Sequence, residues 1–266
     1  MPDVRPAAVA GMFYPKAPER LASEIRAYLA DAGTHAATAP KALIVPHAGY
    51  VYSGPIAASA YALLAPLRDS VERVVLLGPA HRVAVRGLAT TGQHAFETPL
   101  GNVPIDADGV ARALAFAQVS VSDAAHAHEH ALEVQLPFLQ SVLRSFSLVP
   151  FAVGHATPDE VAEVVDALWG GPETLVVVSS DLSHYHPYAE AKRIDRATAD
   201  AILERSPTLC HEQACGATPI NGLLQCARHR GLAPRLLDLR NSGDTAGDRE
   251  RVVGYASFAF VGHERR

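Results

Sequence analysis

The chain of 266 residues is 48% hydrophobic and 19% charged, a balance typical of soluble globular proteins. It excludes a disordered chain, a collagen-like fibre and a coiled coil. The net charge of −5 provides neither the basic footprint of a nucleic-acid-binding protein nor a polybasic membrane patch, so we expect neither nucleic acid nor a membrane as a partner.

The cysteines and the absence of long apolar stretches indicate a cytoplasmic protein. Cys210, Cys215 and Cys226 form no CxxC pair, and free thiols are the rule in a reducing compartment. The chain begins without an apolar leader, and no apolar stretch approaches 18 residues. No linker divides the sequence, so we expect a single domain spanning residues 1–266.

Apolar runs bounded by Gly, Pro or polar residues predict the strands. In chain order they span residues 42–45, 71–77, 146–153, 174–178 and 252–261. Pro150 interrupts the third run, which indicates an edge position or a bulge. Because such uniformly apolar runs suit strands covered on both faces, we expect a layered sheet.

Amphipathic segments lie between these runs and predict helices. They span residues 21–29, 56–64, 132–143, 161–168, 194–203 and 220–227. Strands alternating with helices favour an α/β fold, namely an α/β/α sandwich around a central sheet that is mostly parallel or mixed.

Three histidines each follow a predicted buried strand. His47 comes after the run at 42–45, His81 after the run at 71–77, and His184 after the run at 174–178. Ligands of open α/β sheets bind outside the carboxyl ends of the strands, so parallel neighbouring strands would bring these imidazoles together. Imidazole is the commonest metal ligand and carries protons near neutral pH, although a single histidine after a strand can equally be a surface residue.

A second cluster contains His126, His128, His130, Glu129 and Glu133. Some of these residues could be metal ligands. Alternatively the segment is a polar helix start in which Glu129 meets the positive end of the helix dipole, or a carboxylate here orients an imidazole. His130 and Glu133 are three residues apart and would share one helix face.

Cys215 lies in a turn of small residues that opens the predicted helix at 220–227. A helix N-terminus lowers a thiol pKa, and thiolates ligate metals; the alternative is a small buried apolar side chain. We interpret Cys210 and Cys226 as structural. The sequence contains neither a Walker A loop nor a GxSxG elbow, so a P-loop and a serine hydrolase have no support.

Several blocks together resemble the Memo family, which includes the bacterial and archaeal AmmeMemoRadiSam system protein B. They follow the order of the family and cover nearly the whole chain. The blocks are 5–15 (RPAAVAGMFYP), 45–50 (VPHAGY) with 53–54, 77–81 (LGPAH), 98–101 (TPLG), 129–138 (EHALEVQLPF), 179–185 (SSDLSHY), 215–216 with 219–220, and 253–256 (VGYA).

The resemblance implies a fold related to the LigB-type, class III extradiol dioxygenases, which hold Fe(II) with two His and one carboxylate. By motif, His47 and His81 match the two ligands and His184 matches the acid/base histidine. Cys215 stands where the dioxygenases have their Glu ligand, as is typical of the Memo family. A thiolate favours iron or copper, with zinc also suited, over Mg or Ca.

The matched blocks also contain Asp181, His130 and Glu133, which we interpret as residues that line the pocket or orient the ligands. Two function classes remain open. One is a metal-dependent, dioxygenase-like oxidoreductase acting on a small molecule. The other is a non-catalytic protein that uses the pocket for a phosphorylated peptide or small anion, or a scaffold for radical-SAM and AMMECR-type partners.

Overall fold

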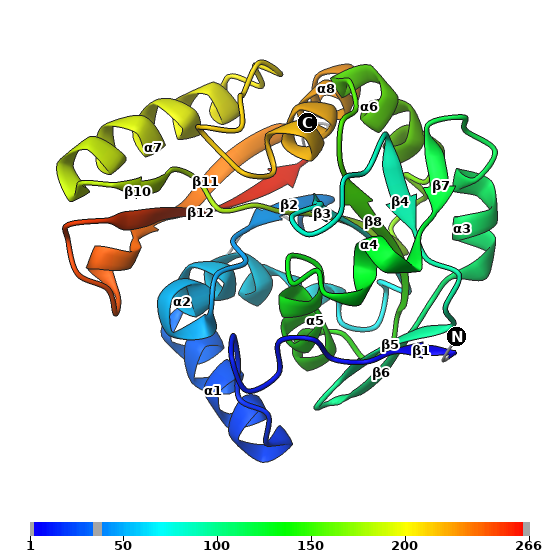
Figure 1. Ribbon diagram of the computed structural model, residues 1–266, viewed down its shortest axis with the longest axis horizontal. Helices are drawn as coiled ribbons and strands as arrows, with labels where there is room; N and C mark the ends of the chain where they lie inside the picture. Colours follow the sequence, from blue (N-terminus) through cyan, green and yellow to red (C-terminus); the bar gives the residue numbers. More distant parts are fainter. Residues whose placement is uncertain (1–2, 34–38, 263–266) are drawn as a thin grey trace.

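The computed structural model describes residues 3–33 and 39–262. Within these residues, one nine-stranded sheet runs through the middle of the molecule (Figure 1), in the order β10-β12-β2-β9-β3-β8-β4-β7, with β11 also paired to β12. Its strands are β2 (Ala42–Val45), β3 (Arg73–Pro79), β4 (Leu88–Thr90), β7 (Val119–Val121), β8 (Ser147–Val153), β9 (Thr174–Ser179), β10 (His184–His186), β11 (Ala233–Asn241) and β12 (Val252–Val261).

The four central strands β2, β9, β3 and β8 are parallel. Antiparallel pairs flank them, with β12 beside β2 and β4 beside β8, so the sheet is mixed. Successive side chains of a strand point to opposite faces. In β3, Val74 and Leu76 pack into one apolar cluster, whereas Val75 and Leu77 pack into the other. This two-sided burial explains why the strands read as continuous apolar runs.

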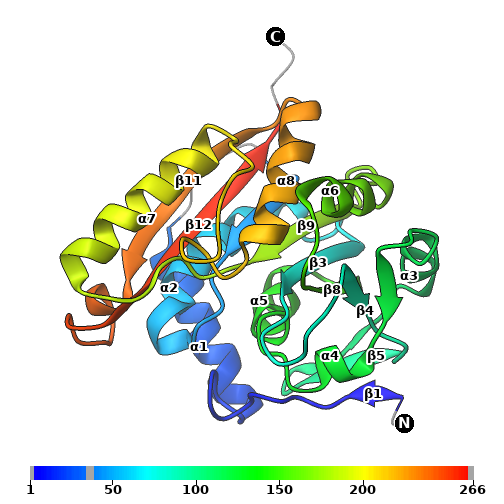
Figure 2. The same ribbon diagram turned by 45° about the horizontal axis from the view of Figure 1, so that its top comes forward.

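Helices cover both faces of the sheet (Figures 1 and 2). One face packs against α1 (Pro18–Asp31), α2 (Tyr50–Tyr61), η1 (Ala62–Leu67), η2 (Glu133–Gln135) and α5 (Leu136–Val142). The opposite face packs against α3 (Ala107–Ala113), α6 (Pro158–Ala167), α7 (Tyr188–Leu203) and α8 (Ala217–His229). The predicted α/β/α sandwich is therefore confirmed.

Smaller elements complete the fold, and of these β1, β5 and α4 lie below the main sheet in Figure 2. A three-stranded sheet has the order β1-β5-β6. The remaining elements are β1 (Val4–Arg5), β5 (Ala95–Thr98), β6 (Gly101–Pro104), α4 (Asp123–Ala127) and η3 (Ser242–Asp244). No helix of the described residues is long and apolar enough to cross a membrane.

The five predicted strands are present as β2, β3, β8, β9 and β12, but the interpretation of Pro150 needs correction. Its strand lies inside the sheet, and the pairing of β3 with β8 runs without a register shift, so there is no bulge. Pro150 is tolerated because β4 pairs only with Ala152 and Val153 of this strand. The missing N–H of proline therefore removes no bond on that side.

The predicted helices are also present, with two differing in form. The segment predicted at 56–64 is α-helical only to Tyr61, and its last residues belong to the 3₁₀ helix η1. Residues 132–143 do not form one continuous helix, because a short 3₁₀ turn, η2, precedes α5. Pro137 lies in the first turn of α5, where its missing N–H would have no helical partner. The strands with few apolar residues, such as β6 and β10, had no apolar run that could reveal them.

Candidate metal centre

His47 and His81 lie close together because their strands share a neighbour. His47 follows β2 and His81 follows β3, and β9 pairs in parallel with both strands. The chain therefore leaves both strands at the same edge of the sheet. The two ring centroids are 5.3 Å apart and the ring planes are nearly perpendicular, at 79°. Of the three strand-end histidines expected to converge, His47 and His81 do so, whereas His184 is not among the described residues whose ligand atoms lie within 4.8 Å of one another.

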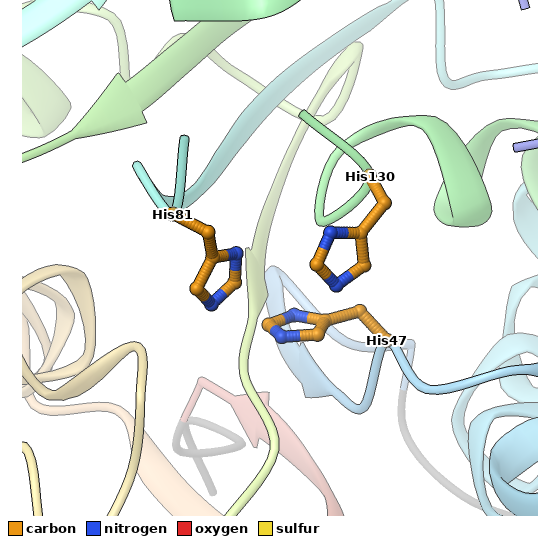
Figure 3. A group of neighbouring side chains, drawn as sticks. All are labelled: His47, His81 and His130. Carbon is orange, nitrogen blue, oxygen red and sulfur yellow. The ribbon is translucent and has the colours of Figure 1, made fainter. Parts of the chain in front are cut away.

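His130 is the third imidazole of this cluster (Figure 3). It comes from the irregular segment before η2, and its ring lies 4.9 Å from His81 and 5.3 Å from His47. One ring nitrogen from each of the three residues lies within 4.8 Å of the other two. On its other side His130 packs against Phe13, at 4.8 Å between ring centroids. The three imidazoles together could hold a metal ion.

Two imidazoles of the cluster, those of His47 and His130, favour the neutral form. Burial, with a smaller effect from the neighbouring His81, lowers the pKa of His47 to about 3. Burial and the adjacent His47 lower the pKa of His130 to about 4. Neutral imidazole has a free lone pair and can ligate a metal, whereas imidazolium cannot. At neutral pH these two side chains are therefore poor partners for an anion and good partners for a cation.

Cys215 also reaches the cluster. Its Sγ lies 3.3 Å from Nε2 of His47 and 3.6 Å from the main-chain oxygen of Asp181. The N–H of Gly216 donates to Ser180 Oγ, and a Cβ on Gly216 would lie only 2.6 Å from Ser180 Cβ. This close approach holds the turn before α8 against the end of β9. Cys215 therefore lies beside His47, although it is not one of the three residues whose ligand atoms lie within 4.8 Å of one another.

The thiol of Cys215 differs from the expectation for a helix N-terminus. Burial and the nearby Asp181 raise its pKa to about 12, so desolvation outweighs any effect of α8. Without an ion the group is a thiol. Coordination by a cation would deprotonate it.

Asp181 and His184 lie on the side of the cluster formed by the end of β9. The carboxylate Oδ1 of Asp181 accepts a hydrogen bond of 2.7 Å from the His47 main-chain N–H, and its Oδ2 lies 3.9 Å from His47 Nε2. Burial raises the pKa of Asp181. His184 is half-buried in β10, near enough for a positive charge on it to lower the pKa values of both His47 and Asp181. Tyr185, beside it, has a φ of 63° and exposes its ring.

The two carboxylates of the 126–133 segment have different partners. Glu129 faces the cluster, with Oε1 2.9 Å from His81 Nδ1 and 3.3 Å from His130 Nδ1. Glu133 points away from it and binds Arg5 at 2.6 Å. Burial alone would raise the pKa of Glu129, but hydrogen bonds from His81 lower it to about 2. The sequence signal for Glu129 was its place beside three histidines, which also fitted a simple helix start.

The other two histidines and the two cysteines considered are placed elsewhere. His128 is exposed at the end of α4. His126 is buried against Phe96, and its Nε2 lies 2.9 Å from the main-chain oxygen of Ala89. Cys226 is buried in α8 and Cys210 is exposed. None of these four belongs to the imidazole cluster of the described residues.

Comparison with known proteins identifies the family. The model of the family described as Memo-like protein matches residues 5–259. Similar curated proteins, each described as a MEMO1 family protein, come from Aeropyrum pernix (36% identity; 95% of this chain, 98% of the relative), Sulfolobus acidocaldarius (34%; 97% and 99%) and Aquifex aeolicus (34%; 97% and 99%). A match over nearly the whole chain, which includes each residue of the imidazole cluster, shows that this chain belongs to the Memo-like family.

Proposed function

We propose that this protein binds iron or copper through His47, His81 and Cys215, and that it is an oxidoreductase acting on a small molecule. The observation that carries the proposal is the convergence of imidazoles from separate strand ends, with a thiol 3.3 Å from His47. Imidazole and thiolate together suit copper, iron or zinc better than Mg or Ca. A redox-active ion held there would supply one-electron chemistry.

Three protein ligands would leave an open position, the arrangement that catalytic sites use. His130 supplies a third imidazole, so it is the alternative third ligand to Cys215. In the arrangement we propose, His130 packs between Phe13 and His81 as a wall of the pocket. His184, near enough to Asp181 to affect its pKa, would hold or accept a proton of the bound small molecule.

The proposed site is tested by metal content after anaerobic purification. We expect about one iron or copper per chain in the wild type, loss of metal in His47→Ala, and strongly reduced metal in Cys215→Ser. His130→Gln should retain metal, and His155→Gln, at an exposed site, is the matched control. Cobalt substitution adds a direct readout, because a thiolate-to-cobalt charge-transfer band should be present in the wild type and absent in Cys215→Ser.

Two results would contradict the proposal. If Cys215→Ser retains metal and His130→Gln loses it, the ion is held by imidazoles alone. If the metal-free protein binds a phosphorylated peptide through the same pocket, the protein is an adaptor. The adaptor reading needs protonated imidazoles to pair with phosphate, and the low pKa values of His47 and His130 disfavour it at neutral pH.

A further inference from the structure

We infer that one short segment, Glu129 to Gln135, determines that both strand-end imidazoles donate from Nδ1, so that each presents Nε2 to the site. The inference rests on the proposed metal site, which gives these nitrogens their use. Glu129, Ser179 and Gln135 are positioning residues of this site, and they act through His47 and His81.

His81 is fixed by a carboxylate. Glu129 is almost fully buried, and its Oε2 accepts the main-chain N–H of His81 at 2.6 Å while its Oε1 lies 2.9 Å from His81 Nδ1. A carboxylate oxygen can only accept, so the proton of the His81 ring must lie on Nδ1. Nε2 is then the ring nitrogen left to face the site. The anionic partner also makes this nitrogen a stronger donor to a cation.

The position of the ring proton of His47 is determined by Ser179, whose hydroxyl hydrogen is donated to another group. Ser179 Oγ lies 2.9 Å from His47 Nδ1, and it donates its single hydrogen to the carbonyl of Ala131 at 2.7 Å. Gln135 Nε2 donates to the same Oγ at 2.8 Å and to the carbonyl of Pro46 at 2.9 Å. A carbonyl only accepts, so these directions are fixed and Ser179 can only accept from His47. His47 therefore has its proton on Nδ1 and its lone pair on Nε2, facing Cys215.

The two arrangements share one peptide unit. The N–H of Ala131 donates to Glu129 Oε1 at 2.9 Å, and the carbonyl of the same residue accepts from Ser179. The N–H of Ala131 therefore supports Glu129, which binds His81. The carbonyl of Ala131 accepts the hydroxyl proton of Ser179, which binds His47. Arg5 holds the start of this segment, since it donates to the main-chain oxygens of His126 and Glu129 at 2.7 and 2.6 Å.

The tautomers can be measured without any metal. Two-bond proton–nitrogen NMR of the histidine-labelled apo protein distinguishes Nδ1–H from Nε2–H rings, and His47→Gln and His81→Gln identify the two signals. We expect both rings in the Nδ1–H form. Ser179→Ala should shift His47 toward a mixture of forms and leave His81 unchanged, and Glu129→Gln should change His81 and leave His47 unchanged.

Cobalt binding provides the second readout, and Ser257→Ala the control. We expect Ser179→Ala and Glu129→Gln each to weaken Co(II) binding by about 10–100-fold. Ser257 is also a fully buried strand serine, but its hydroxyl has no hydrogen-bond partner among the described residues, so its loss should change neither readout.

The outcomes separate this inference from the proposed function. An Nε2–H ring at His47 or His81 in the apo wild type would overturn the inference, as would unchanged tautomers in both positioning variants, even if metal still binds. Nδ1–H rings that respond as expected, in a protein that binds neither cobalt, iron nor copper, would support the inference and refute the proposed function.

Discussion

The buried ion pair between Arg5 and Glu133 should be the most costly single interaction to break outside the candidate site. The side chains are 1% and 0% exposed. Glu133 accepts four donors: the Arg5 guanidinium at 2.6 Å, the main-chain N–H groups of Ala8 and Val9 at 2.7 and 2.9 Å, and the Tyr14 hydroxyl at 2.6 Å. This one carboxylate fastens the opening segment of the chain to the main body.

Glu133→Gln keeps the shape but removes the charge, and it turns an N–H₂ group toward donors. Removing one partner of a buried pair costs about 3–5 kcal/mol, because the other charge remains buried without compensation. Here Arg5 also donates to three main-chain oxygens, which offsets part of the loss, so we expect about 3 kcal/mol. For a chain of this size that lowers the melting temperature by roughly 6–12 °C.

Urea unfolding of Glu133→Gln, Arg5→Met and the double variant measures the pair by a double-mutant cycle. We expect the double variant to lose much less than the sum of the single losses, since neither charge is then left alone. Asp69→Asn, at an exposed ion pair with Arg144, is the control and should not change the midpoint resolvably. Additive losses, or single losses below about 1 kcal/mol, would refute the reasoning.

Further predictions concern buried charges and tight backbone positions. Burial raises the pKa of Asp195 to about 6, so the folded state holds the carboxyl proton more tightly than the unfolded state. The free energy of unfolding therefore falls as pH rises from about 4 to 6. Asp195→Asn should restore about 2–3 kcal/mol at pH 7, measured by urea unfolding at several pH values. Lys41 donates to three main-chain oxygens at 2.5–2.7 Å, so Lys41→Met should cost about 2–4 kcal/mol by the same assay. Gly87 has a φ of +77° and its Cβ would lie 2.0 Å from the Gln118 oxygen, so Gly87→Ala should lower the melting temperature far more than Gly101→Ala, which has a φ of +114° and open space.

The fold was predictable because its central strands are covered on both sides. Runs such as 42–45 and 174–178 are apolar throughout, and this pattern marks them regardless of what packs against them. The strands at the margins of the sheet, such as β10 and β11, are partly exposed and contain His184, Arg235 or Asp238, so their composition resembles that of loops. Their strand structure depends on pairing with β12, which is a long-range contact.

The candidate site was predictable only where the backbone topology decides it. His47 and His81 follow parallel strands, and the edge of the sheet brings them together whatever lies between them in sequence. The position of His130 depends on the path of an irregular segment. The sequence of that segment has no periodicity from which the path could be predicted. Nor could spacing show that Glu129 faces His81 while Glu133, four residues later, faces Arg5.

Hydrogen bonds connect the candidate site to the opening segment of the chain. They explain why Arg5, which is far from the site in sequence, is so fully buried. Arg5 binds the main-chain oxygen of Glu129, and the carboxylate of the same Glu129 holds His81. An irregular segment has no helical or strand ladder to satisfy its own backbone groups, so it needs such external partners to keep one conformation. Because both imidazoles take their orientation from this segment, the ion pair that fastens it to the N-terminal strand stabilises the geometry of the site as well as the fold.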